Sequence, residues 1–155
     1  MKPVLRPRAL GVCAAAAMMA VLGACSTRID EINTKNVDQI VDEFVSGRAE
    51  LDCYLACATK FGANQAAMRN LHDAGLWDDL AKLVITIGYN QDISWYYLGR
   101  SAEGLGLHDA ALTYYKRSIA SEYKCQSFML NVCSGLAVPE TVNQRIAMID
   151  ASKRR

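Results

Sequence analysis

Histidine and proline are scarce in this sequence, and charge of neither sign dominates it. Its 155 residues include two histidines and three prolines, and 17 Lys and Arg residues face 16 Asp and Glu residues. A protein with this balance of charges offers no broadly basic face for nucleic acid. The scarcity of proline and of Val and Thr runs favours helix. With 52% hydrophobic residues, the chain has enough apolar side chains for one domain of ordinary size and does not have a disordered composition.

The motifs of common catalytic sites are also missing. There is no glycine-rich phosphate loop, no Gly-x-Ser-x-Gly elbow and no His-Glu-x-x-His. The spacing of His72 and His108 does not suggest a metal pair. Capping and helix-dipole effects explain four aspartates near expected helix turns: Asp73, Asp78, Asp79 and Asp109. The sequence therefore predicts a protein without catalysis, without a bound metal and without a cofactor.

A basic segment followed by an apolar one opens the chain. The first eight residues carry Lys2, Arg6 and Arg8 and no acid, and residues 9–24 are apolar throughout. That run is shorter than the roughly 20 residues of a stable membrane-spanning helix. Small residues end it, as at a signal-peptidase site. Residues 1–24 are therefore predicted to be an export signal rather than a permanent membrane anchor.

The end of this leader resembles the lipobox of bacterial lipoproteins, because Leu22, Gly23 and Ala24 stand directly before Cys25. In that family the cysteine thiol carries diacylglycerol, and the signal is cut just before it. Two or three acyl chains hold a protein on a membrane, whereas one chain is marginal. Ser26, in place of Asp, resembles sorting to the outer membrane, with the protein facing the periplasm. Ordinary secretion, with Cys25 as a plain thiol, is the alternative.

The predicted mature chain begins with a tether. Residues 25–36 are polar after the cysteine and have no apolar period, so they are expected to link the lipid to a folded domain over residues 37–155. Cleavage removes three basic residues and no acid. The 14 basic and 16 acidic residues that remain give a net charge of about −2.

Apolar residues recur at spacings of three and four beyond the tether, as in amphipathic helices. The first helix is expected from Val37, with Asn36 as N-cap and its end near Gly47. A last helix is expected from Pro139. A helical hairpin is expected around Gly75. The positions expected to be buried are Ala67, Leu71 and Ala74 before Gly75, Leu80, Leu83, Val84 and Ile87 after it, and Val142, Ile146 and Ile149 in the last helix.

One stretch resembles the tetratricopeptide repeat (TPR), because it matches that pattern without a gap at Trp95, Leu98, Gly99, Ala111 and Tyr115. Gly106 stands at the usual turn, whereas Ala102 replaces the usual Tyr and Tyr123 stands where proline usually closes the repeat. The resemblance implies an all-α, TPR-like fold of antiparallel helical hairpins, a short α-solenoid with atypical capping helices. It also implies one repeat over residues 92–125 and an earlier, degenerate copy over residues 61–91. Gly99 would let the two helices approach closely.

The same resemblance implies a concave groove that holds a partner. The side chains expected to face it, free of the packing between helices, are Arg69, His72, Tyr96, Arg100 and Glu103. They are predicted to bind an extended or helical peptide by polar contacts. The alternative for these residues is a solvated polar face. The predicted function is therefore that of an envelope-anchored adaptor or scaffold for another envelope protein.

Four cysteines remain outside the leader and the lipid site: Cys53, Cys57, Cys125 and Cys133. An even number in an exported protein favours disulfides, and four cysteines allow three connectivities. On a regular helix the Cβ atoms of Cys53 and Cys57 would be about 5–6 Å apart, whereas a disulfide needs about 3.8 Å. Two local bridges are favoured, because each pair brackets a boundary of the repeat pattern. The competing hypothesis is a periplasmic thiol-redox or metal-handling protein.

Overall fold

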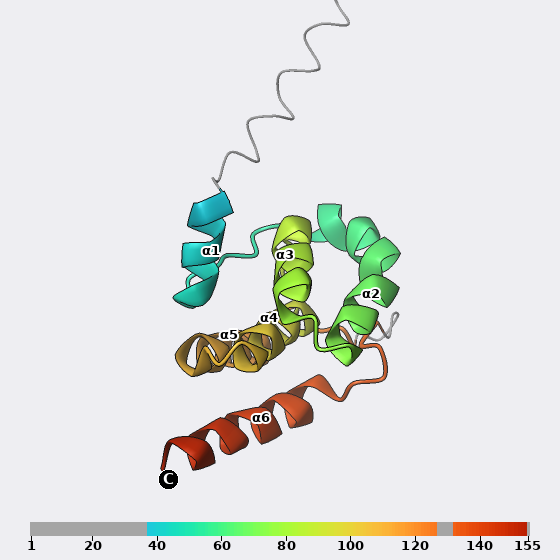
Figure 1. Ribbon diagram of the computed structural model, residues 1–155. Helices are drawn as coiled ribbons and strands as arrows, with labels where there is room; N and C mark the ends of the chain where they lie inside the picture. Colours follow the sequence, from blue (N-terminus) through green and yellow to red (C-terminus); the bar gives the residue numbers. More distant parts are fainter. Residues whose placement is uncertain (1–36, 127–131, 155) are drawn as a thin grey trace, which may run out of the picture. The chain divides into compact units, whose positions relative to one another are not determined.

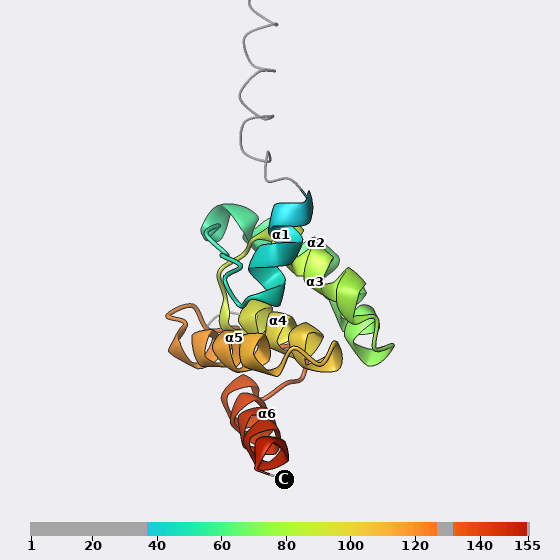
Figure 2. The same cartoon turned by 60° about the vertical axis from the view of Figure 1, so that its left-hand side comes forward.

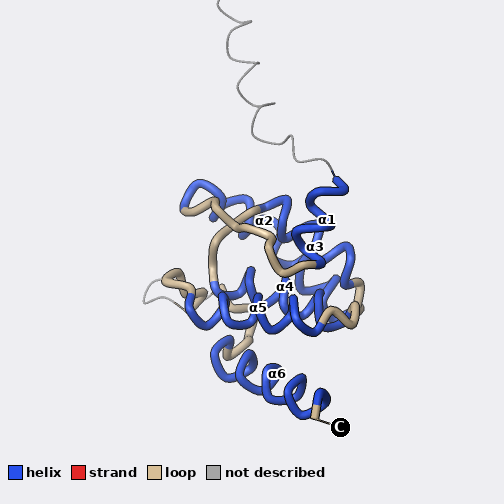
Figure 3. Tube along the Cα trace, turned by 90° about the vertical axis from the view of Figure 1, so that its left-hand side faces the viewer, coloured by secondary structure: helices blue, strands red, loops and turns tan. Residues whose placement is uncertain are grey.

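The computed structural model describes residues 37–126 and 132–154, and within them regular structure is helical (Figures 1 and 3). Cys53 and Tyr89 pair in an isolated parallel bridge, and these residues contain no strand. The all-α prediction is confirmed. In chain order the elements are α1 (Val37–Val45), the 3-10 helix η2 (Leu55–Cys57), α2 (Ala58–Asp73), α3 (Trp77–Ile87), α4 (Asp92–Gly104), α5 (His108–Ala120) and α6 (Val138–Lys153).

Several predictions fall on other parts of the chain. The signal over residues 1–24, the lipid site Cys25, the tether and the N-cap Asn36 lie outside the described residues. Among the helices that the structure describes, none has both the length and the apolar character needed to cross a membrane.

From α2 onward each helix packs against the next one in the chain (Figures 1 and 2). The most extensive contact joins α4 to α5, and α6 covers the side of α5. Gly75 separates α2 from α3, and Gly106 separates α4 from α5. Their φ angles of 70° and 77° are left-handed, a conformation that glycine adopts without the strain imposed by a Cβ atom. Both predicted turns are therefore confirmed.

The packing role of the aromatic and small residues in α4 and α5 is confirmed as well. Leu98, Ala111 and Tyr115 are fully buried, and Trp95 is nearly so. A Cβ atom added to Gly99 would lie 2.5 Å from two ring carbons of Tyr115. No side chain fits at that distance, so the close approach of α4 and α5 depends on glycine at this position.

The predicted buried face of α2 is correct only in part. Leu71 is partly buried against the core, but Ala67 and Ala74 are exposed, and the fully buried side chains of α2 are Phe61 and Met68. Phe61 and Met68 lie seven residues apart and so share one face of the helix. Burying such a large side chain contributes about 1.5–3 kcal/mol, far more than an alanine can, so the large side chains decide which face turns inward.

The predicted faces of α3 and α6 agree better with the structure. Leu80, Val84 and Ile87 are buried in α3, and Leu83 is partly buried. In α6 the predicted positions Val142 and Ile149 are buried and Ile146 is partly buried. Val138 is buried as well, and Pro139 stands in the first turn of the helix.

Candidate functional site

Four of the five residues predicted to line a groove do not lie on an open surface. Tyr96 is 3% exposed, and the side chains of Arg100 and Glu103 are 16% and 13% exposed. His72 is also mostly covered. Arg69 is exposed and lines a depression of about 610 Å³ between α2 and the segment around Ser134. The expectation that packing leaves Tyr96, Arg100 and Glu103 free is therefore wrong.

Glu103 is the centre of a polar cluster that ties α6 to the α4–α5 pair. Its Oε2 accepts hydrogen bonds from Arg100 Nη1 at 2.8 Å, from Arg145 Nε at 2.9 Å and from the Tyr115 hydroxyl at 2.5 Å. A second nitrogen of Arg145, in α6, donates to Oε1. Both carboxylate oxygens are thus satisfied by side chains from three helices, so we call these four residues the Glu103 cluster.

The predicted groove residues on α2 and α4 extend this cluster towards the turn between α2 and α3. The guanidinium of Arg100 lies over the ring of Trp77, 5.0 Å from its centroid, and its Nε donates to His72 Nε2 at 3.5 Å. The Tyr96 hydroxyl lies 3.4 Å from the same nitrogen. These side chains contact one another, so they hold neighbouring helices together and are not open to a partner.

The pKa of Glu103 reflects two opposing effects. Burial would raise it, but hydrogen bonds from Arg145 and Tyr115, together with the charges of Arg145 and Arg100, outweigh burial and hold it below 4.5. Burial of the Tyr115 hydroxyl, reinforced by the neighbouring carboxylate of Glu103, strongly raises the pKa of this hydroxyl. At neutral pH the cluster therefore holds an ionised carboxylate and a neutral phenol.

The lowered pKa predicts a loss of stability in acid. Below the ordinary glutamate pKa of about 4.5 the unfolded state binds a proton more readily than the folded state, so the contribution of Glu103 is lost as the pH falls through its lower folded-state value. Urea unfolding between pH 7 and pH 3 should show a steeper fall for the wild type than for Glu103→Gln. Parallel curves would show that this carboxylate does not cause the acid sensitivity.

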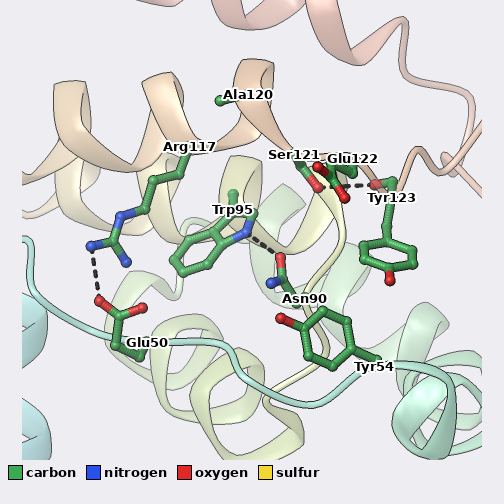
Figure 4. Close-up of a pocket in the computed structure, with 9 residues that line it drawn as sticks. All are labelled: Glu50, Tyr54, Asn90, Trp95, Arg117, Ala120, Ser121, Glu122 and Tyr123. Atoms are coloured by element: carbon green, nitrogen blue, oxygen red, sulfur yellow. Dashed lines mark hydrogen bonds and ion pairs between the residues drawn. The ribbon is translucent and has the colours of Figure 1, made fainter.

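A different surface has the features of a binding site. It is a cleft of about 490 Å³, shown in Figure 4. One wall is the segment that carries Glu50 and Tyr54, and the other is the C-terminal end of α5 with residues 121–123. We call it the tyrosine cleft. Its lining residues are Glu50, Tyr54, Asn90, Trp95, Arg117, Ala120, Ser121, Glu122 and Tyr123.

Each tyrosine of the cleft lies close in sequence to a disulfide: Tyr54 stands between Cys53 and Cys57, and Tyr123 stands two residues before Cys125. The bridges join Cys53 to Cys57 and Cys125 to Cys133, with Cα atoms 5.8 and 5.0 Å apart, which is the local pairing that the sequence favours. Cys53 lies outside any helix and forms the isolated bridge with Tyr89, whereas Cys57 ends the 3-10 helix η2. The two cysteines therefore do not share a regular α-helix, as a bridge over this spacing requires. Both bridges therefore lie close in sequence to the cleft.

The rings of Tyr54 and Tyr123 meet at the mouth of the cleft. Their centroids are 5.3 Å apart and their planes are inclined by 55°. Tyr54 is 48% exposed and Tyr123 is 41% exposed. Two large aromatic faces thus remain available to a ligand, although each already contacts the other.

Backbone hydrogen bonds fix both tyrosine-bearing segments to the start of α4. The amide of Asp92 donates to the carbonyl of Tyr123 at 2.9 Å, and its buried carboxylate accepts from the amide of Cys125 at 2.7 Å. Burial raises the pKa of this carboxyl group, against the effect of the hydrogen bonds from the amides of Cys125 and Ile93. On the other wall, the amide of Asn90 donates to the carbonyl of Cys53 at 2.7 Å. The cleft is therefore preformed.

The floor of the cleft is polar as well as aromatic. The guanidinium of Arg117 lies over Trp95, 5.0 Å from its ring centroid, and donates to Glu50 at 3.0 Å. The indole N–H of Trp95 donates to the side-chain oxygen of Asn90 at 2.9 Å. Glu122 forms no hydrogen bond or ion pair within the part of the chain that the structure describes. Within those same ranges no group of three or more His, Cys, Asp or Glu residues is arranged to hold a metal ion.

No protein-family model, curated protein or solved structure matches this chain. The sequence analysis did not identify the cleft, although one signal was present: Tyr54 follows Cys53, and Tyr123 precedes Cys125 by two residues. Aromatic residues beside disulfide-forming cysteines are held in fixed positions, so their location can be used as a clue. Arg117 carries no such clue, because only folding brings it to the cleft.

Proposed function

We propose that the chain is a bacterial envelope lipoprotein, anchored by acyl groups on Cys25, that acts as an adaptor for another envelope protein. The lipobox-like leader supports the anchor, and Ser26 supports an outer-membrane position facing the periplasm. The packing of α2 to α6 in chain order and the close approach at Gly99 support a TPR-like arrangement with repeats over residues 61–91 and 92–125. The adaptor would bind its partner without catalysis.

The tyrosine cleft is the observation that carries the adaptor proposal. Tyrosines offer large, rigid contact areas at low cost in side-chain entropy. Because the walls of the cleft are already fixed by disulfides and hydrogen bonds, a partner would pay little to order them. The binding site is thus proposed at the cleft rather than at the Glu103 cluster, whose side chains already bind one another.

The competing thiol-redox function has a weaker basis. Reactive cysteines are accessible thiolates in electropositive surroundings. Cys125 and Cys133 are 1% and 3% exposed, Cys53 and Cys57 are half-buried, and each pair is joined in a disulfide. No described feature favours this function over the adaptor.

The adaptor proposal predicts position-specific crosslinking in the native envelope. A photoreactive benzoyl-phenylalanine at position 54 or 123 of the full, lipidated chain should yield an adduct of the same mass, because both positions face the same cleft. Met148, which is 59% exposed on α6, provides the control position. With the probe at position 54, Tyr123→Ala should lower the yield about tenfold, as expected for an aromatic hot spot. The adducts are measured by immunoblotting and mass spectrometry.

Two outcomes would contradict parts of this proposal. If position 69 gives the adduct and position 54 does not, the depression beside Arg69 is the binding surface instead of the cleft. The anchor is tested separately with a fatty-acid analogue. Its label should disappear in Cys25→Ser, and a label that persists in this variant would remove the lipoprotein assignment.

A further inference from the structure

The lining of the tyrosine cleft carries more negative than positive charge. It contains the carboxylates of Glu50 and Glu122 and the guanidinium of Arg117. Arg117 and Glu50 neutralise each other through their ion pair at 3.0 Å. Within the described ranges the carboxylate of Glu122 is left uncompensated, and it stands next in the chain to one of the two exposed tyrosines.

The floor of the cleft already shows how this surface binds a cation. Arg117 lies over the face of Trp95, and the same guanidinium reaches Glu50. A cation is attracted both to the electron-rich face of an aromatic ring and to a carboxylate. The mouth of the cleft offers the same two elements in the rings of Tyr54 and Tyr123 and in Glu122, but no side chain of the described residues supplies a cation there.

The end of α5 also lies at the cleft, although the ammonium of Lys124 offsets part of its negative charge. The last residue of α5, Ala120, and the following Ser121 line the cleft, so the C-terminal, negative end of the helix dipole faces it. Lys124 is the nearest basic residue in the sequence. Its ammonium donates to the carbonyl of Ile119 at 2.9 Å, and Lys124 does not line the cleft.

We infer that the tyrosine cleft binds a positively charged side chain, arginine or lysine, of an extended segment of the partner protein. The cation would lie against the rings of Tyr54 and Tyr123, beside the carboxylate of Glu122. This inference rests on the proposed adaptor function and names the chemistry of its partner. A neutral glycan also stacks on tyrosine rings, but the charge of the cleft favours the cation, and the test separates the two.

The test compares charged and neutral probes of one shape. Dye-labelled hexapeptides with a central arginine, lysine or citrulline are titrated against the full, acylated chain in neutral detergent micelles, and binding is followed by fluorescence anisotropy. Citrulline keeps the shape of arginine without its charge. The arginine and lysine peptides should bind about tenfold more tightly than the citrulline peptide. Their advantage should shrink as salt is raised, because salt screens exposed charges.

Two variants that remove the same charge assign the effect to the cleft. Glu122→Gln should weaken binding of the arginine peptide about tenfold while leaving the citrulline peptide unchanged. Glu140→Gln removes a carboxylate from the exposed first turn of α6, outside the cleft, and should change neither affinity. Equal effects of both variants would show that net charge, and not this site, attracts the peptide.

The remaining outcomes overturn the inference, and they separate it from the adaptor proposal. Equal binding of arginine and citrulline peptides, no binding of the arginine peptide at millimolar concentration, or tighter binding of neutral chitotetraose would each show that the cleft does not select a cation. If the adduct at position 54 still forms in the envelope, the adaptor function stands with a different ligand chemistry. If that adduct is also missing, both proposals fail.

Discussion

Replacing Glu103 by alanine is expected to lower the free energy of unfolding by about 3 kcal/mol. The substitution leaves Arg100, Arg145 and the Tyr115 hydroxyl without the acceptor they share. Breaking a buried ion pair from one side costs about 3–5 kcal/mol, because the remaining charge stays desolvated. The lower end applies here, since the side chain of Arg145 is 28% exposed and can recover some hydration.

A matched variant separates this effect from the loss of one carboxylate. Glu50 also pairs with an arginine, Arg117 at 3.0 Å, but its side chain is 61% exposed. Glu50→Ala should therefore cost less than about 1 kcal/mol. Both free energies are measured by urea unfolding of the full chain, followed by far-ultraviolet circular dichroism. Similar losses in the two variants would show that the Glu103 cluster is no stronger than a surface ion pair.

The loss of stability in Glu103→Ala is expected to come largely from weaker attachment of α6 to the α4–α5 pair. Arg145 is the residue of α6 that reaches Glu103, so the double variant with Arg145→Ala should be less destabilised than the sum of the two single variants. A coupling energy of at least about 1 kcal/mol would be expected for groups in one hydrogen-bonded network. Additive losses would mean that Arg100 and Tyr115 account for the effect and that α6 is held by its apolar face alone.

The part of the fold that could be predicted from the sequence is the part set by spacing within neighbouring helices. Gly99, Ala111 and Tyr115 lie in two consecutive helices joined by a short turn, so the pattern of small and aromatic residues reports directly on how these helices meet. The turn at Gly106 follows from the same local rule, because the turn needs a left-handed residue. Helical class and hairpin turns are therefore readable from the sequence.

The part that could not be predicted depends on which distant element covers a given face. Arg145 reaches Glu103 across 42 residues of sequence, and nothing in the spacing of α4 indicates that α6 covers it. The meeting of Tyr54 with Tyr123 has the same origin, since two loops far apart in the chain are both tied to the segment around Asn90 and Asp92. Periodicity shows that a face exists but does not identify its neighbour. Side chains that were expected to line an open groove therefore hold helices together, and the open tyrosine cleft lies at other residues.

Removal of the Cys125–Cys133 bridge is expected to have the second largest effect on stability. In the chain-entropy account, closing a span of nine residues contributes about 2.6 kcal/mol, so the variant Cys125→Ala/Cys133→Ala should lose about that much free energy of unfolding. The cleft should be affected less than the stability. Its Tyr123 remains held by the backbone bond from Asp92, and Asp92 can still accept from the amide at position 125.

The same variant separates the structural role of the cysteines from the redox hypothesis. If the bridge is structural, thiol titration of the native, folded wild type should find Cys125 and Cys133 oxidised and resistant to mild reductant, because both are almost completely buried. The variant should then unfold at lower urea and retain most of its adduct at position 54. A native protein with free thiols at these positions, or a variant as stable as the wild type, would contradict the structural role and favour a bridge that opens and closes in function.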